Sequence, residues 1–202
     1  MTASRSAISL KKQPHQARGR ASISAIVEAA AQLLEMQGLG AVNTNLIARR
    51  AGVGIGTLYQ YFPSKEAVLA ELLRRERRDL ICEFEAALDQ TLGAGLEPTV
   101  LALLRVAADH QLRRPKLGTA LEYVERLLPL DQETADINGR IAALVASRLD
   151  QLQIADPELA ARDVSALARG MIDASGLAGE TDASSVVRRL APAVLGYLKA
   201  RM

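Results

Sequence analysis

The 202-residue sequence has few of the residues that usually carry catalysis or bind metals. It contains one cysteine, Cys82, and two histidines, His15 and His110. A single cysteine excludes an internal disulfide, and no Ser/His/Asp, Cys/His or metal-ligand spacing is present. We therefore predict no catalytic residue, no metal site and no cofactor. Cys82 is interpreted as a small buried apolar side chain, with redox sensing as the alternative.

Aromatic residues and long apolar runs are also scarce. Aromatics make up 3% of the chain and tryptophan is absent, whereas apolar residues make up 49%. That apolar content argues against disorder and predicts a core of Leu, Ala, Val and Ile. No apolar run approaches the length of about 18 residues that would suggest a membrane span. We expect no membrane association.

Acidic residues are missing from positions 1–27, and the charge of the chain is unevenly distributed. Residues 1–78 carry a net charge of +7 and the remainder −5. A basic end joined to an acidic body is typical of a nucleic-acid-binding protein. Residues 1–19 are interpreted as a flexible basic arm that either adds phosphate or minor-groove contacts or has no function. Residues 1–27 also superficially resemble an organellar transit peptide, which we consider the weaker interpretation.

Apolar residues recur at helical spacing along the chain, and no stretch has the alternation of a strand. The pattern predicts an all-α fold of about nine helices. Apart from the two short helices within residues 44–65, helices are expected at 20–38, 64–92, 98–112, 115–127, 132–153, 157–178 and 184–200.

Residues 44–65 predict two short helices around a turn, followed by the start of a third. Gly52 suits the left-handed conformation that ends a helix. The second short helix offers hydroxyl and amide groups from Thr57 to Tyr61 on one side and apolar residues on the other. Ser64 follows Pro63 and is placed to cap the next helix. This pattern is typical of a helix-turn-helix that reads DNA.

Three glycines in this segment allow another interpretation. Gly52, Gly54 and Gly56 also suggest a phosphate-binding loop, but Thr57 stands where the third glycine of that motif belongs. No β-α-β pattern surrounds them. The helix-turn-helix is therefore favoured over a nucleotide site.

Residues 47–66, Ile-Ala-Arg-Arg-Ala-Gly-Val-Gly-Ile-Gly-Thr-Leu-Tyr-Gln-Tyr-Phe-Pro-Ser-Lys-Glu, resemble the signature of TetR/AcrR-type transcriptional regulators. Residues 20–38 resemble the first helix of that family. The resemblance implies a three-helix DNA-binding domain at 20–66 and a larger helical domain for effector binding and dimerisation at 67–202. It also implies a cytoplasmic bacterial protein, associated with the nucleoid when it is bound to DNA.

The motif positions imply a set of DNA-contacting residues. They are Thr44, Asn45, Ile55, Gly56, Thr57, Tyr59, Gln60, Tyr61 and Lys65. The chemistry of Gln60 suits adenine in the major groove, and Asn45 suits a base or a phosphate. The hydroxyls and Lys65 suit phosphate oxygens. Gly54-Ile55 departs from the family, in which many members carry a more polar pair, so Ile55 either touches a thymine methyl or only packs.

The last two helices carry wide apolar stripes, and the resemblance implies that they form the interface of a homodimer. The predicted interface residues are Val164, Leu167, Ala168, Met171, Ile172, Ser175, Val187, Leu190, Ala191, Val194, Leu195 and Leu198. Burial within one subunit is the alternative. A two-fold dimer predicts a pseudo-palindromic operator in double-stranded DNA.

The resemblance further implies a small-molecule effector. Possible anchors are Arg105, Asp109, His110, Glu122, Tyr123 and Arg126, although surface positions or structural ion pairs are the simpler interpretation of each. A mainly aliphatic pocket would suit an apolar or amphiphilic molecule. We therefore predict a repressor that an effector releases from its operator. A non-inducible DNA-binding or architectural protein and an activator are the alternatives, and an enzyme is disfavoured.

Overall fold

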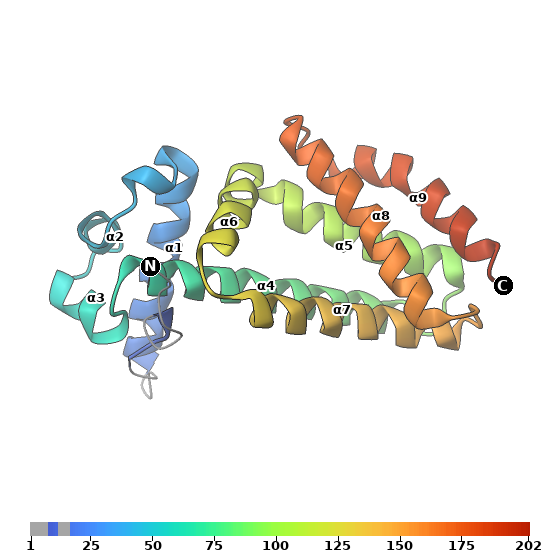
Figure 1. Cartoon of the computed structure of the whole chain (residues 1–202), viewed down its shortest axis with the longest axis horizontal. Helices are drawn as coiled ribbons and strands as arrows, with labels where there is room; N and C mark the ends of the chain where they lie inside the picture. Colours follow the sequence, from blue (N-terminus) through green and yellow to red (C-terminus); the bar gives the residue numbers. More distant parts are fainter. Residues whose placement is uncertain (1–7, 12–16) are drawn as a thin grey trace. The chain divides into compact units, whose positions relative to one another are not determined.

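The computed structural model describes residues 8–11 and 17–202, and within these ranges the chain is helical, with no strand (Figure 1). This confirms the predicted all-α class. The elements are α1 (Ala17–Gln37), η2 (Leu39–Ala41), α2 (Thr44–Arg50), α3 (Ile55–Tyr61), α4 (Lys65–Gln90), α5 (Leu96–Arg113), α6 (Pro115–Leu127), α7 (Asp131–Gln151), α8 (Pro157–Leu177) and α9 (Ala183–Lys199).

Local sequence signals explain where the helices around the turn begin and end. Asn43 caps α2, because its side chain accepts a hydrogen bond from the Leu46 N–H at 3.0 Å. Gly52 has a φ of 68°, so the predicted left-handed turn is present. Ser64 accepts a hydrogen bond from the Ala67 N–H at 3.3 Å and caps α4 as predicted.

The chain forms two compact units, and the division falls inside α4. The head comprises the described part of Met1–Glu76 together with Lys116–Asp131. The body comprises Arg77–Pro115 and Gln132–Met202. The expected boundary at residue 67 therefore differs from the observed one by about three turns of α4. The chain also passes between the two units three times, and not only through the long helix.

The core of the head is built from α1 to α4 and from α6. Leu58 and Phe62 have no exposed surface, and they pack in one cluster with apolar residues of α1. The α6 residues Leu117, Leu121 and Val124 belong to the same cluster. Helix α6 therefore belongs structurally to the head, although the sequence suggested that it was part of the effector domain.

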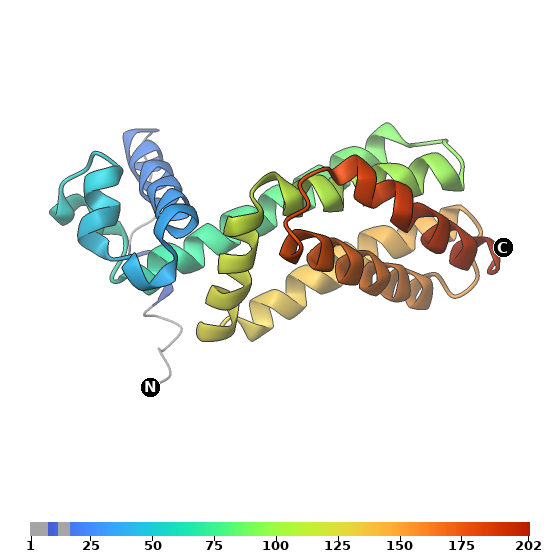
Figure 2. The same cartoon turned by 90° about the horizontal axis from the view of Figure 1, so that it is seen from above.

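The core of the body is formed by α5, α8 and α9, which pack against one another (Figures 1 and 2), together with the later part of α4 and the end of α7. It is almost entirely aliphatic, as the scarcity of aromatics predicted. Arg148 is a buried exception: its guanidinium donates to the carbonyls of Leu88 at 2.6 Å and Thr91 at 3.2 Å. A cation there satisfies acceptors at the C-terminal end of α4 and complements its dipole.

A polar contact joins α8 to α9. The Tyr197 phenol donates a hydrogen bond to the Asp163 carboxylate at 2.5 Å. That bond raises the pKa of Tyr197 above its ordinary value, because the bond holds the phenol in its protonated form. The contribution of this bond to stability is therefore present at neutral pH and is lost only as the pH rises through the raised pKa.

Two further findings bear on the sequence predictions. Cys82 is exposed, so its interpretation as a buried side chain is wrong; its neighbour Ile81 occupies the inward face of α4 instead.

Within residues 8–11 and 17–202, no helix is long and apolar enough to cross a membrane.

Candidate nucleic-acid interface

Helix α3 has one buried side and one exposed side, and the exposed side carries four of the nine predicted DNA contacts. Leu58 fixes the buried side in the head core. On the other side Ile55 is 39% exposed, Tyr59 is 43% exposed, and Gly56 and Gln60 are also exposed. A two-turn helix anchored in this way presents a narrow ridge that a major groove can accept.

The start of α2 lies against this ridge. The Thr44 hydroxyl and the Tyr59 phenol are 3.1 Å apart and share a hydrogen bond. Asn45, the next residue of α2, is exposed. The structure therefore brings Thr44 to Tyr59, which lies 15 residues further along the chain, and Asn45 follows directly after Thr44. Their DNA contacts stay a prediction.

The remaining predicted DNA contacts are less open. Thr57 and Tyr61 are half-buried, and Tyr61 packs against the head core. The Lys65 ammonium donates to the Val42 carbonyl at 3.4 Å, so it supports the loop before α2. A phosphate contact by Lys65 would have to compete with this bond or share the ammonium with it.

Gly56 has space above it that no other part of the described chain occupies. A Cβ built at Gly56 meets no heavy atom within 4 Å. Glycine in a helix costs roughly 0.5–1 kcal/mol relative to alanine. No packing contact in the head requires a glycine at this position. Close approach of the backbone to a phosphate would require one, because it needs a residue without a side chain.

Sequence reasoning missed residues 8–11, which lie at the other end of α3. Ile8 is 1% exposed and belongs to the head core. The Lys11 N–H donates to the Tyr61 carbonyl at 2.8 Å, and its ammonium to the Tyr59 carbonyl at 3.3 Å. This part of the chain is therefore not a free arm. The rest of the predicted arm that precedes α1, residues 1–7 and 12–16, lies outside the described residues.

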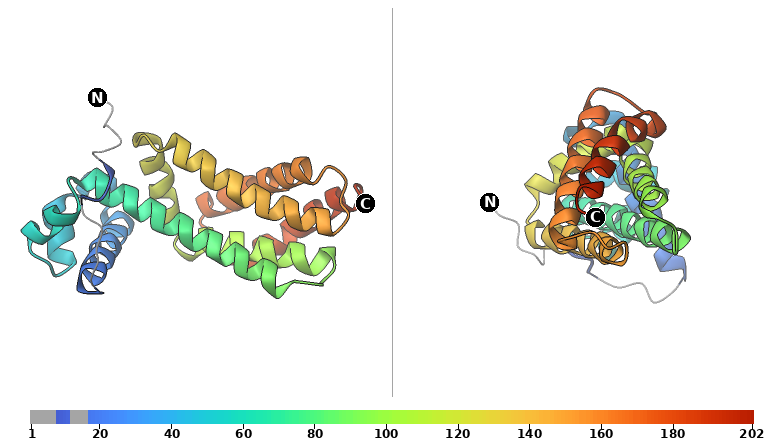
Figure 3. Two further views of the ribbon diagram at one scale, coloured as in Figure 1. Left: turned by 90° about the horizontal axis from the view of Figure 1, so that it is seen from below. Right: turned by 90° about the vertical axis from the view of Figure 1, so that its right-hand side faces the viewer.

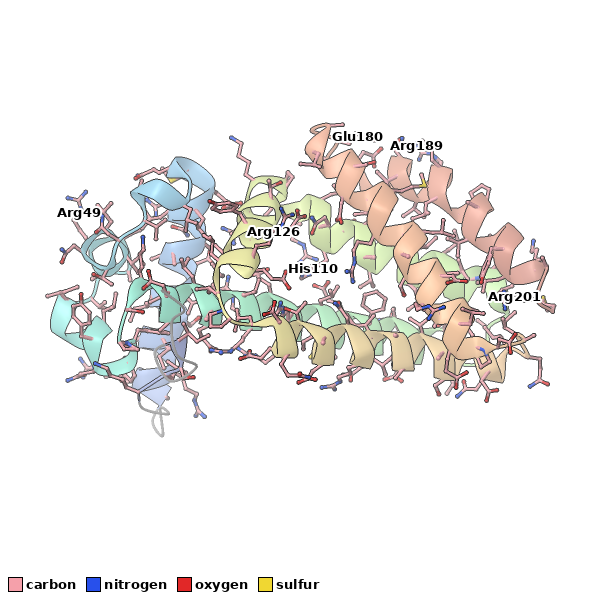
Figure 4. The ribbon with its side chains drawn as sticks, in the orientation of Figure 1. Arg49, His110, Arg126, Glu180, Arg189 and Arg201 are labelled. Carbon is pink, nitrogen blue, oxygen red and sulfur yellow. The ribbon has the colours of Figure 1, made fainter. Side chains whose placement is uncertain are left out.

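Basic residues are exposed at the end of α2, the helix that precedes the turn. Arg49, labelled in Figure 4, and Arg50 are exposed in the last turn of α2. The Arg50 guanidinium donates to the Gln32 amide oxygen at 2.7 Å, which ties α2 to α1. These charges, together with Lys11, agree with the basic balance of the N-terminal part of the chain.

The predicted dimer residues mostly face the core of their own protomer, which agrees with the alternative of burial within one subunit; a dimer through α8 and α9 stays a prediction. Leu190 and Leu198 have no exposed surface, and only Leu167 and Met171 of the twelve are not buried. The buried residues are Val164, Ala168, Ile172, Ser175, Val187, Leu190, Ala191, Val194, Leu195 and Leu198. The stripes are real, but the helices use them to hold the body together.

The exposed sides of these two helices carry a set of small or apolar residues, alongside the exposed Arg162 and Arg169 of α8 and Arg188, Arg189 and Lys199 of α9. The set comprises Ala166, Leu167, Gly170, Ala174 and Leu177 on α8 and Pro192, Ala193 and Gly196 on α9. We call this the α8–α9 face. Helices α8 and α9 lie side by side in every view (Figures 1–3), so the exposed residues of α8 and those of α9 belong to neighbouring helices.

The six predicted effector anchors divide between the two units. Arg105, Asp109 and His110 lie on α5 in the body, and Glu122, Tyr123 and Arg126 lie on α6 in the head. Arg105 and Asp109 form an exposed ion pair at 2.8 Å, and Glu122 and Arg126 another at 3.9 Å. Tyr123 is 55% exposed. For the two pairs, the simpler structural interpretation therefore accounts for the residues.

His110 differs from the other five. Its side chain is 16% exposed, and Figure 4 shows it on α5. Its buried Nδ1 lies 3.5 Å from the Glu83 carboxylate but has no hydrogen-bond partner. A surface pocket of about 270 Å³ in the body is lined by Asp109, Leu112, Arg113, Thr181 and Ala183, and His110 is not among its lining residues.

Comparison with known families agrees with this architecture. Residues 26–72 match the model of the tetR family of bacterial regulatory proteins, and residues 91–198 match the tetracyclin repressor-like C-terminal domain. The chain belongs to the tetR family of transcriptional regulators. This confirms the predicted family. Members of this family are DNA-binding regulators and not enzymes.

Individual relatives are distant. An uncharacterized helix-turn-helix regulator of Mycobacterium tuberculosis, Rv1255c, is 30% identical over 65% of this chain and 63% of its own length. The fatty acid metabolism regulator protein of Bacillus subtilis is 29% identical over 55% of this chain and 58% of its own. The chain thus spans less than two thirds of either relative. The structure of a TetR-family regulator from Mesorhizobium loti has the same fold, with a TM-score of 0.77 at 20% identity over 92% of this chain and 98% of that one.

Proposed function

We propose that this chain is a homodimeric repressor that binds a pseudo-palindromic operator through α2 and α3 and is released by a small-molecule effector. The observation that supports the proposal most is the exposed side of α3. It gathers Gly56, Tyr59 and Gln60 on a ridge held by Leu58, beside the Thr44 hydroxyl. Family membership gives this surface its proposed partner, double-stranded DNA.

The contacts divide into those that fix position and those that read sequence. Thr44 and Tyr59 offer hydroxyls at one place and would hold a phosphate, which sets register without specifying bases. The exposed Gln60 amide suits adenine N6 and N7, and the exposed Ile55 side chain suits a thymine methyl. Asn45 would contribute from the start of α2.

Replacing Gly56 by alanine is expected to stabilise the head by up to about 1 kcal/mol and to weaken DNA binding. The added methyl group meets nothing in the protein but stands where the DNA backbone would approach. Operator and random DNA should both bind less tightly, because a phosphate contact carries no sequence information. Urea denaturation and DNA titration measure the two effects.

Gly139→Ala is the matched control, because Gly139 is an exposed glycine of α7 with equally open space. It should stabilise the protein and leave DNA binding unchanged. Wild-type DNA affinity in Gly56→Ala would show that the backbone there does not approach DNA.

Gln60→Ala is expected to cost roughly 1–3 kcal/mol of operator binding and to relax preference at one base position. The Gln60 side chain is exposed, so the head should keep its stability. Binding to a panel of single-base operator variants measures the preference. If the variant binds every operator sequence more weakly by the same factor, Gln60 contacts a phosphate and not a base.

The proposed dimer uses the α8–α9 face. Leu167 and Leu177 are 42% and 72% exposed there, and the helix glycines Gly170 and Gly196 have no neighbour within 4 Å of a built Cβ. A second copy that packs closely would bury these leucines and would account for the glycines. Two-fold symmetry would then place two reading helices on half-sites about 34–36 Å apart, or somewhat more.

The proposed effector binds in the body, with His110 as a polar anchor. The buried Nδ1 of His110 makes no hydrogen bond and lies 3.5 Å from the Glu83 carboxylate, so it would be available to the polar group of an amphiphilic molecule. The name of the Bacillus subtilis relative, a fatty acid metabolism regulator, is in keeping with an effector of this kind. The three passages of the chain between body and head are covalent routes by which binding would alter the head.

An operator search tests the DNA part of the proposal. Fragments from around the gene are titrated with the protein at controlled salt, with random duplex as the competitor. A regulator should show a site bound far more tightly than bulk DNA. No preference above bulk DNA would contradict the proposal.

A ligand titration tests the release. Amphiphilic candidates that bind the protein are added to the operator complex, and a coupling of about 1–3 kcal/mol should lower DNA affinity about 5–150-fold. His110→Ala should remove the response and keep operator binding. Tight binding of every candidate without release would favour the non-inducible alternative, and transcription that rises when the operator is occupied would identify an activator.

A further inference from the structure

We propose that residues 8–11 form an N-terminal clamp that sets the position of α3, so that discrimination between DNA sequences depends on chain that precedes α1. This rests on the proposed reading of DNA by α3. The clamp comprises Ile8, Ser9, Leu10 and Lys11, and it is distinct from the residues that would touch bases.

The clamp is attached at both ends. Ile8 is fully buried in the head core, and the Arg74 guanidinium of α4 donates to its carbonyl at 3.0 Å. Lys11 donates from its backbone to Tyr61 and from its ammonium to Tyr59. Four consecutive residues therefore connect the last turn of α3 to the first half of α4.

Helix α3 needs such support because it is short. Seven residues make a helix that is marginal alone, and its last carbonyls have no partners within the helix. The Lys11 bonds satisfy the carbonyls of Tyr59 and Tyr61, and a cation at this end complements the helix dipole. Since both carbonyls belong to the last turn of α3, loss of the clamp would loosen the end of the helix that carries the proposed reading surface.

The arrangement also explains why apolar residues occur in a stretch that composition alone describes as a polar, basic arm. Leu10 packs against the head core together with Ile8. A binding site must be held within about 0.5 Å of its productive geometry to keep its specificity. The clamp supplies that restraint from outside the helix-turn-helix itself.

Two truncations of the full chain provide the test. Removal of residues 2–7 leaves the clamp intact, whereas removal of residues 2–11 deletes it. Hydrogen exchange of the amides at 57–62 is measured without DNA, followed by affinity for operator and for random duplex. We expect faster exchange and about tenfold weaker operator binding only in the longer truncation, with random DNA bound as by wild type.

Point variants separate positioning from charge. Ile8→Ser should reproduce the longer truncation, and Leu101→Ser is the control, a comparable replacement of an aliphatic residue at an exposed position of α5. Lys11→Met should accelerate exchange in α3 and leave the salt dependence of binding unchanged. A salt slope reduced by about one would make Lys11 a phosphate contact and overturn the positioning role.

Exchange at 57–62 equal to wild type in the longer truncation and in Lys11→Met would also overturn the clamp. The exchange measurement needs no operator, so it tests the clamp even where no specific site is found. Failure of the clamp and failure of the proposed DNA reading are thereby distinguishable.

Discussion

Phe62→Ala is expected to cost the head about 3–5 kcal/mol of unfolding free energy and to abolish DNA binding. Phe62 has no exposed surface and is the largest of the fully buried side chains. It follows the last residue of α3, and its backbone N–H still bonds to the Leu58 carbonyl at 2.9 Å. A cavity at this position removes the core packing that holds the end of α3, so the loss of stability and the loss of DNA binding would have the same cause.

Tyr59→Ala is the contrasting variant, since both residues are aromatic and only three positions apart. Tyr59 is 43% exposed, so its removal should leave stability nearly unchanged while DNA binding weakens. Phe62→Leu keeps most of the volume and should cost less than about 1.5 kcal/mol. Urea denaturation of the three variants measures the difference. Wild-type stability in Phe62→Ala would contradict the role assigned to this side chain.

This contrast shows what the sequence could predict. The apolar spacing around Leu58 and Phe62, the glycine at Gly52 and the cap at Ser64 are local signals, and each of these features is present in the structure. Local chemistry determines a helix-turn-helix because its elements are short and its core is formed by near neighbours in sequence. The DNA contacts themselves stay a prediction, since exposure alone does not identify a partner.

The errors arose where distant parts of the chain meet. The α6 leucines and the clamp residue Ile8 join the head core across long sequence separations, which a periodic pattern does not encode. Asn43 was missed as a cap although an asparagine before a helix is a recognisable signal. A stripe such as Leu190 and Val194 shows which face of a helix is buried, but not whether its own subunit or a partner covers it.

Leu167→Glu is expected to break the proposed homodimer and, with it, operator binding. Leu167 lies on the α8–α9 face and is 42% exposed, so the isolated protomer accepts the change. In the dimer each copy would place a carboxylate in an apolar contact, at a cost of several kcal/mol per ion. Because the symmetry brings two such charges together, the dimer dissociation constant should rise about 1000-fold or more.

A monomer would still contact one half-site, so the loss on DNA has a specific form. Leu167→Glu should bind a full operator no better than a single half-site, whereas wild type should gain from the second half-site. Leu101→Glu makes the same change at a leucine of α5 that is 38% exposed, and it should keep both the dimer and the operator affinity. Sedimentation velocity and titration of full and half operators measure these quantities. A dimeric Leu167→Glu with full operator affinity would remove the α8–α9 face from the proposal and require another surface to pair the reading helices.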